Sequence, residues 1–242
     1  MGAAPTVGRL TRLAQVASTQ DLVHQLGEEG APHGSAIVAV EQVSARGTRG
    51  RAWQAPPGGL WLSVLLRPED ATAVDVLSLR VGLAVARALE AAGKVPPIGL
   101  KWPNDLILGD RKLAGVLCEA RWRGERLGWI TVGVGINVAN PIPDEVRGTA
   151  ARLGDHDPQL TPDALAEPVR TAIAGVDLAA GQLSLAEVDE FGRRNWLRGR
   201  RLLEPIVGIA GEVLADGTLQ VRAEDGNVQV ARGGTVVLEG RS

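Results

Sequence analysis

Residues 98–138 decide the fold of this 242-residue chain, and they read IGLKWPNDLILGDRKLAGVLCEARWRGERLGWITVGVGINV. Apolar and β-branched residues alternate with other residues over much of this stretch, which is typical of β-strands. A turn with the sequence Trp-Pro-Asn-Asp and a second turn at Gly124 interrupt the pattern. The stretch therefore predicts several strands of one sheet, at 98–101, 106–108, 113–123 and 129–138.

Elements on either side of this stretch complete an α/β body. Further apolar strands are predicted at 35–41 and 60–66, and helical spacing of apolar residues predicts helices at 18–29, 74–92, about 163–180 and 184–197. From about residue 200 the pattern changes to short alternating strands around Asp216-Gly217 and Asp225-Gly226, which are typical hairpin turns. We therefore expect a small barrel attached to the body.

The composition limits the class of protein. A net charge of −2 and a pI near 6.0 argue against a general nucleic-acid binder, which is usually basic. Cys118 is the single cysteine, so we expect no internal disulfide and no cysteine zinc cage. No apolar run approaches the length of a membrane span, and we attribute the loose N-myristoylation pattern at residues 1–6 to chance. A cytoplasmic protein is expected.

A cationic loop follows the strand at 35–41. Arg46, Arg49 and Arg51 alternate with glycines, and Trp53 follows them. Glycine lets the backbone approach a ligand closely, guanidinium groups match phosphate, and an indole offers a flat face to a nucleobase. A solvated surface loop is the plain alternative, but a mobile loop between two buried strands is a common place for phosphate binding.

Two polar motifs interrupt the central strands. In Lys101-Trp-Pro-Asn-Asp105 the carboxylate of Asp105 is suited to Mg²⁺, although Asn104 and Asp105 equally fit a turn that bonds its own backbone. The second motif is Arg111-Lys-Leu-Ala-Gly-Val-Leu-Cys-Glu119, in which Lys112 begins an apolar strand and is placed to neutralise a carboxylate or phosphate. Lys112 and Gly115 would point to opposite faces of a regular strand. If both line one site, Lys112 comes from the turn or Gly115 contributes backbone only.

The strand at 129–138 has one bare face. Gly133, Gly135 and Asn137 share this face, and the valines and isoleucine between them share the other. Glycine weakens a strand interior, so two on one face indicate that a ligand or backbone presses against it. No glycine motif leads from a strand into a helix, which excludes dinucleotide binding of the usual kind. The three histidines are interpreted as surface or turn residues, and Cys118 as a small buried hydrophobe.

Taken together, these stretches resemble the biotin–protein ligase family over nearly the whole chain, from Ser18-Thr19 to the terminal barrel. The loop of that family reads roughly Gly-Arg-Gly-Arg-Arg-Gly-Arg-x-Trp and corresponds to residues 45–53. Its Lys-Trp-Pro-Asn-Asp stands unchanged at 101–105, its Lys-Leu-Ala-Gly is at 112–115, and its Gly-x-Gly-x-Asn is at 133–137.

The resemblance implies an α+β fold. A mixed β-sheet flanked by helices, similar to class II synthetases, would form a catalytic domain over residues 1–197, with an SH3-like β-barrel over 198–242. The implied enzyme uses ATP and Mg²⁺ to activate biotin as an acyl-adenylate, then transfers biotin to a lysine of a biotin carboxyl carrier protein. Nucleic acid and membrane are not expected partners, and the family includes both monomers and homodimers.

The resemblance also implies the roles of individual residues. Those implied to bind biotin are Ser18, Thr19, Gln42, Arg46, Lys112, Gly115 and Gly133. Those implied on the nucleotide side are Arg49, Arg51, Trp53, Asn104 and Asn137. Catalysis would rest on Lys112 with Arg46, Arg49 and Arg51, and Asp105 would help to place Mg²⁺.

The chain departs from the family pattern at three positions. Thr48 stands where the family often has arginine, and the lower charge of the loop would weaken retention of the adenylate. Ala45 replaces a glycine and restricts any positive φ needed there. Gln20 stands where asparagine is common, so its contact is not given by the resemblance.

Three other functions compete with this interpretation. A lipoate–protein ligase shares the fold and the adenylation chemistry, but the arginine loop and the barrel favour biotin. A DNA-binding regulator would need an N-terminal domain, and the Ser18-Thr19 motif leaves no room for one. Its support is a basic cluster formed by Arg193, Arg194, Arg198, Arg200 and Arg201, which we expect at a solvated surface or at the junction with the barrel. Ligand binding without catalysis does not account for the charged loop.

Overall fold

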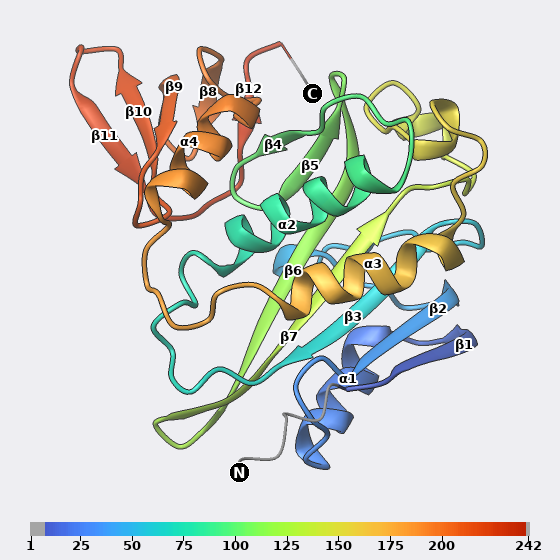
Figure 1. Ribbon diagram of the computed structural model, residues 1–242. Coiled ribbons are helices and arrows are strands. Elements are labelled where there is room, and N and C mark those ends of the chain that lie inside the picture. The colour runs from blue at the N-terminus through green and yellow to red at the C-terminus, as the bar shows by residue number, and fades with distance from the viewer. Residues whose placement is uncertain (1–7, 241–242) are drawn as a thin grey trace.

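A seven-stranded sheet forms the centre of the computed structural model, which describes residues 8–240 (Figure 1). In spatial order its strands are β1 (Leu10–Val16), β2 (Ala36–Gln42), β3 (Leu60–Leu66), β7 (Arg126–Ile136), β6 (Arg111–Arg123), β5 (Asp105–Leu108) and β4 (Gly99–Lys101). β1 and β2 run parallel, and the remaining neighbours pair antiparallel. The predicted mixed sheet is confirmed.

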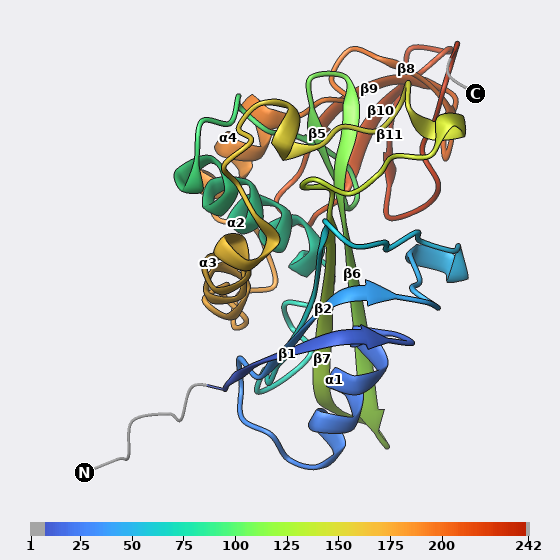
Figure 2. The same ribbon diagram turned by 90° about the vertical axis from the view of Figure 1, so that its right-hand side faces the viewer.

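Helices cover both faces of this sheet (Figure 2). The helix α1 (Thr19–Glu28) packs on one face, where Val23 meets Ile37, Leu65 and Trp129 in a small core. On the opposite face, α2 (Leu77–Ala92) and α3 (Pro162–Ala174) bury the larger core. Because β3 lies between the two layers, all of its residues are buried, which explains its continuous apolar sequence.

A second sheet follows α4 (Leu185–Arg194). Its strands, in spatial order, are β11 (Val228–Ala231), β10 (Leu219–Ala223), β9 (Gly208–Val213), β8 (Arg201–Glu204) and β12 (Val237–Leu238). Neighbouring strands are antiparallel, but within residues 8–240 the end strands β11 and β12 do not pair with each other. The expected barrel is therefore an open, barrel-like sheet. Buried Trp102 ties it to the body by donating from Nε1 to the carbonyl of Gly217 at 2.9 Å.

The structure corrects several predicted boundaries. The helix α3 ends at Ala174 rather than near 180, because Gly175 caps it, and α4 ends at Arg194 rather than at 197. The strand β1 was not predicted, because its apolar residues lie three apart, a spacing typical of a helix. Three short 3₁₀ turns, Thr48–Gly50, Asp144–Val146 and Leu153–Asp155, lie in the loops.

The membrane predictions concern two parts of the chain. No helix within residues 8–240 has both the length and the apolar character needed to cross a bilayer. The N-terminal lipidation pattern at residues 1–6 lies outside the described residues.

Candidate functional site

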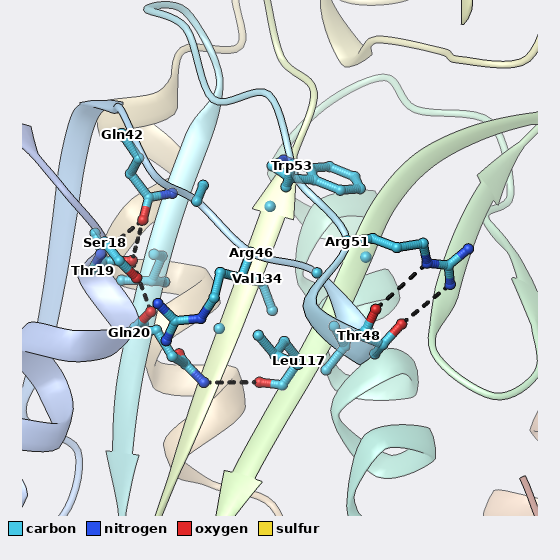
Figure 3. Close-up of a pocket in the computed structure, with 18 of the residues that line it drawn as sticks. Ser18, Thr19, Gln20, Gln42, Arg46, Thr48, Arg51, Trp53, Leu117 and Val134 are labelled. Atoms are coloured by element: carbon cyan, nitrogen blue, oxygen red, sulfur yellow. Dashed lines mark hydrogen bonds between the residues drawn. The ribbon is translucent and has the colours of Figure 1, made fainter. Parts of the chain in front are cut away.

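A cavity of about 260 Å³ opens on the α1 face of the sheet, beside the start of α1 (Figure 3). Side chains alternate along a strand, so Ser63, Gly133 and Gly135 share this face with Leu65 and Trp129. The large side chains lie under α1, while the small ones lie beyond its N-terminus. The hollow exists because these three positions fill little space. We call it the first cavity.

The buried end of the first cavity is a chain of hydrogen bonds. The backbone N–H of Thr19 donates to Oε1 of Gln42 at 2.7 Å, and the Thr19 hydroxyl donates to the same oxygen at 3.0 Å. Oγ of Ser63 lies 2.8 Å from Oγ1 of Thr19. Since the Thr19 proton goes to Gln42, Ser63 must be the donor to Thr19. This chain fixes the orientation of the Gln42 amide. Ser18 is the N-cap of α1, but its side chain makes no cap bond and lines the cavity.

The bare face of β7 is in contact with the site itself. A Cβ added to Gly133 would lie 2.8 Å from Oε1 of Gln20, and one added to Gly135 would lie 2.8 Å from Nε1 of Trp53. Real Cβ atoms essentially never approach other atoms this closely. The sequence predicted that a ligand or backbone presses on this face, but the groups that contact these glycines in the structure are the side chains of Gln20 and Trp53.

A β-bulge places Lys112 on the same face as Gly115. Leu106 pairs with Ala114 and Ile107 with Lys112, so Leu113 is an extra residue in β6. The bulge reverses the alternation, and Nζ of Lys112 lies 3.6 Å from the position of a Cβ on Gly115. Neither alternative proposed from strand parity is therefore needed.

Lys112 lies where three cavities meet. A second cavity of about 450 Å³ extends from Trp53 past Asn137 to Pro141. A third, of about 430 Å³, lies between the body and the second sheet and is lined by Arg49, Asp105 and Thr235, among others. Lys112 lines all three, and its Nζ is 2.6 Å from Oδ1 of Asp105 and 5.1 Å from the centre of the Trp53 ring. One ammonium group can therefore contact groups bound in each cavity.

The loop arginines point to different parts of this site. Arg46 lines the first cavity and donates to both oxygens of Asp21, at 2.9 and 2.6 Å. This pairing raises the pKa of Arg46 and lowers the pKa of Asp21. Arg51 lines the first and third cavities and lies against Thr48.

Arg49 is the loop arginine that does not line the first cavity. It lies in the third cavity and donates to the hydroxyl of Thr235, beyond β11. Its φ of 61° lies in the left-handed region that side chains rarely adopt, whereas φ at Ala45 is not positive, so the restriction expected at Ala45 does not arise.

Hydrogen bonds also fix the side chains of Asn104 and Asn137. Nδ2 of Asn104 donates to the carbonyl of Val116 on β6 at 2.8 Å, rather than to its own turn, and Asn104 lines the first and third cavities. Asn137 lines the second cavity, where its Oδ1 accepts from Asn140 at 3.1 Å. The plain turn interpretation of residues 104–105 is therefore wrong, because Asp105 pairs with Lys112.

Sequence reasoning missed a buried polar layer beneath the first cavity. His24 was expected at the surface but is buried, where its Nδ1 accepts from Trp129 Nε1 at 3.1 Å. Nε2 therefore carries the proton and faces Oγ1 of Thr131 at 2.9 Å. The close approach of His24 also lowers the pKa of Glu119. The four-residue spacing that puts Gln20 and His24 on one face of α1 was a usable signal.

The prediction for Cys118 and the prediction of a metal site at Asp105 have different outcomes. Burial raises the pKa of the Cys118 thiol to about 12, and this partly buried side chain packs against the larger core rather than lying within it. Across residues 8–240 there is no group of three or more side chains suited to hold a metal ion. Asp105 offers one carboxylate, already paired with Lys112. This donor set does not fit an ion held by the protein alone, and it fits only an ion that arrives with a nucleotide.

Comparison with known proteins agrees with this geometry. Residues 13–137 match the model of the biotin/lipoate A/B protein ligase family. The biotin–[acetyl-CoA-carboxylase] ligase of Paracoccus denitrificans is 33% identical over 210 residues, which are 81% of this chain and 83% of that protein. The bifunctional ligase/repressor BirA of Bacillus spizizenii is 34% identical over 143 residues, and the match spans only 44% of its length.

A solved structure covers more of the fold. The biotin protein ligase from Aquifex aeolicus in complex with biotin and ATP superposes with a TM-score of 0.77 at 28% identity, over 95% of this chain and 98% of that one. The residues that match the family model include nearly all of the seven-stranded sheet and every predicted site residue from Ser18 to Asn137. The chain belongs to the biotin/lipoate A/B protein ligase family.

Proposed function

We propose that the chain is an ATP-dependent biotin–protein ligase. The position of Lys112 carries this proposal, because this residue lines all three cavities. A carboxylate at the mouth of the first cavity, a nucleoside in the second and a phosphate chain in the third would meet at this residue. That is the arrangement needed to join an acid to the α-phosphate of ATP.

The first cavity suits the ring of biotin. Its buried end carries oriented amides and hydroxyls from Thr19, Gln42 and Ser63, which match the N–H and C=O groups of a cyclic urea. The hollow lined by Ser63, Gly133 and Gly135 would take the bicyclic ring. With the cyclic urea at the buried end of the first cavity, the carboxylate of biotin would point toward Lys112. The Paracoccus denitrificans relative and the Aquifex aeolicus structure support the choice of biotin.

The reaction has two steps. A carboxylate oxygen of biotin attacks the α-phosphorus of ATP, the bond to the β-phosphate oxygen breaks, and pyrophosphate leaves. The ε-amine of a carrier lysine then attacks the biotinyl carbonyl, loses a proton and displaces AMP. Both substrates of the first step are anions, so Lys112, Arg46 and Arg51 would offset their repulsion and stabilise the charge that develops on the phosphate. Catalysis would rest on positioning and electrostatics.

Trp53 and Asn137 would contact the nucleoside. Trp53 lines both the first and the second cavity, and Asn137 lies at the floor of the second beside Asn140. Arg49 and Asn104 would contact the phosphates from the third cavity. Mg²⁺ would enter as part of the nucleotide substrate and neutralise phosphate charge, with Asp105 as the nearest carboxylate.

The partner and the compartment extend this proposal. The acceptor would be a lysine of a biotin carboxyl carrier protein, and the reaction would take place in the cytoplasm, where ATP is supplied. We also retain a homodimer as a proposal, since β1 and β4 are the end strands of the large sheet. Light scattering of the purified chain tests it.

The competing functions have less support. A lipoate ligase would use the same adenylation chemistry, but a dithiolane ring has no N–H group for the polar end of the first cavity. A DNA-binding role rested on the basic cluster, and each of its arginines is paired with an acid. The pairs are Arg193–Asp189, Arg194–Glu90, Arg198–Glu212, Arg200–Asp110 and Arg201–Glu224. The neighbouring carboxylates cancel most of the positive charge of this cluster, and a nucleic-acid backbone is attracted by net positive charge.

The test is exchange of labelled pyrophosphate into ATP, with biotin and lipoate in parallel. Biotin-dependent exchange, with none for lipoate, is the expected result, and transfer of labelled biotin to a carrier domain tests the second step. Exchange with lipoate alone would assign the chain to the sister activity. No exchange with either acid would contradict adenylation altogether.

A further inference from the structure

The orientation of the Gln20 amide follows from its neighbours. One end of the amide faces the backbone carbonyl of Leu117 at 3.4 Å (Figure 3) and that of Thr131 at 3.2 Å. Carbonyl oxygens only accept hydrogen bonds, so the atom that faces them must be the nitrogen. The other end is therefore the oxygen Oε1. Gln20 is only 4% exposed, so this assignment concerns a buried group.

Oε1 of Gln20 has no hydrogen-bond donor within the described part of the chain. It lies against Gly133 in the first cavity, 2.8 Å from where a Cβ of that glycine would be. The nearby hydroxyl protons are already used, because Ser63 donates to Thr19 and Thr19 donates to Gln42. A buried acceptor without a donor costs free energy of folding. A ligand that brings an N–H group to this point would remove that cost.

We propose that Gln20 determines specificity, with Oε1 accepting a hydrogen bond from one ring N–H of the bound cyclic urea. This inference rests on the proposed function, since it assigns a contact to the ring of biotin. The contact would add to those of Thr19 and Gln42, and a dithiolane ring has no N–H to make it. Such a site rejects ligands that lack the donor, because the acceptor then stays unpaired.

Gln20→Met is the variant that tests the contact. Methionine keeps the length and the unbranched shape of the side chain but removes the amide acceptor. The ligands are biotin and two lactam analogues, in each of which one of the two ring N–H groups is replaced by CH₂. Calorimetry gives the affinity of each ligand for the native and variant proteins, and thermal unfolding with ATP affinity shows that the variant is folded.

The proposal predicts coupling between one N–H group and Gln20. The native protein should bind one analogue about ten- to hundredfold more weakly than biotin. In Gln20→Met, that analogue and biotin should bind within about twofold of each other. The second analogue should keep its full loss in both proteins, because it reports a different contact.

Equal losses for both analogues in the native and variant proteins would overturn the proposal and leave Gln20 a structural role. If the methionine variant does not fold, Gln20→Asn replaces it. A change in the affinity of both analogues alike in this variant would again contradict the proposal. Failure of the native protein to bind biotin at all would instead contradict the proposed function. The two failures are therefore distinguishable.

Discussion

The floor of the first cavity and the cationic loop above it are built in opposite ways. In the floor, Thr19, Gln20 and Ser63 are at most 4% exposed, and backbone groups or hydroxyls fix their orientation. In the loop, Arg46 has a side chain that is 36% exposed, and it is held by Asp21, which is itself half exposed. The floor is therefore preformed, whereas the loop rests on contacts at the surface.

This difference in exposure between floor and loop indicates two separate roles, selection of the acid and retention of the adenylate. Exposed ion pairs contribute at most about 1 kcal/mol, so ligand phosphates can replace the present partners of the loop arginines. A buried floor cannot rearrange at similar cost, because its groups would lose hydrogen bonds. We infer that the floor selects the acid, while the loop and Lys112 act on the charges of the nucleotide and the adenylate.

The largest expected effect is that of Lys112→Ala, which removes the charge where the cavities meet. Pyrophosphate exchange should fall about 100- to 1000-fold, since a group that stabilises developing charge has been lost. Biotin affinity should change much less, because the floor is intact. Arg111→Ala, at the adjacent cation, is the matched control and should keep nearly full exchange. Equal losses in the two variants would remove the special role of Lys112.

A smaller effect is expected for Gly133→Ala, which alters the floor alone. The added Cβ would lie 2.8 Å from Oε1 of Gln20, so that side chain must shift. Biotin should bind about tenfold more weakly, in line with the usual cost of overpacking, and ATP affinity should not change. Gly148→Ala is the control, because its Cβ would meet open space. Unchanged biotin affinity in calorimetry would show that the floor is not preformed.

The loop itself can be weakened or strengthened. In Arg51→Ala the purified biotinyl-adenylate should dissociate about tenfold faster, since a charge-assisted contact is lost. Thr48→Arg adds a cation and should slow dissociation by a few fold. Arg126→Ala, an exposed arginine at the start of β7, is the control. Stopped-flow release measures all three, and equal rates would contradict the retention role of the loop.

The smallest effect concerns the pair Asp21–Arg46. The guanidinium lowers the pKa of Asp21, so the stabilisation is fully present above the ordinary pKa near 4 and is lost as the pH falls through the lower folded value. Asp21→Asn should reduce the free energy of unfolding at pH 7 by less than about 1 kcal/mol, because both groups are partly exposed. The difference from the native protein should vanish once the pH is below the lowered pKa of Asp21 in the folded state. Chemical denaturation across this range measures it, and a difference that persists in acid would point to another cause.

Local patterns predicted the central strands and most helices. The alternation of β7 and the apolar run of β3 report burial directly, so their positions are confirmed. The strand β1 was not predicted, because the spacing of Leu10, Leu13 and Val16 is typical of a helix. The parallel pairing of β1 with β2 is a long-range contact that no local pattern encodes.

The site residues were predicted better than their arrangement. Four motifs supplied most of the side chains that line the three cavities. The bulge at Leu113 was not predictable, because it depends on how β5 and β6 pair. His24 and Gln20 were not recognised as a buried layer, since burial of polar groups depends on partners such as Trp129 and Thr131 that lie about a hundred residues away.

The salt dependence of ligand release tests the division between floor and loop most directly. Dissociation of biotin and of biotinyl-adenylate from the native protein would be measured at about 0.05 M and about 0.5 M NaCl, where charge screening differs strongly. Biotin release should change little, whereas adenylate release should accelerate several fold with salt. Equal salt dependence for the two ligands, or a stronger dependence for biotin, would contradict it.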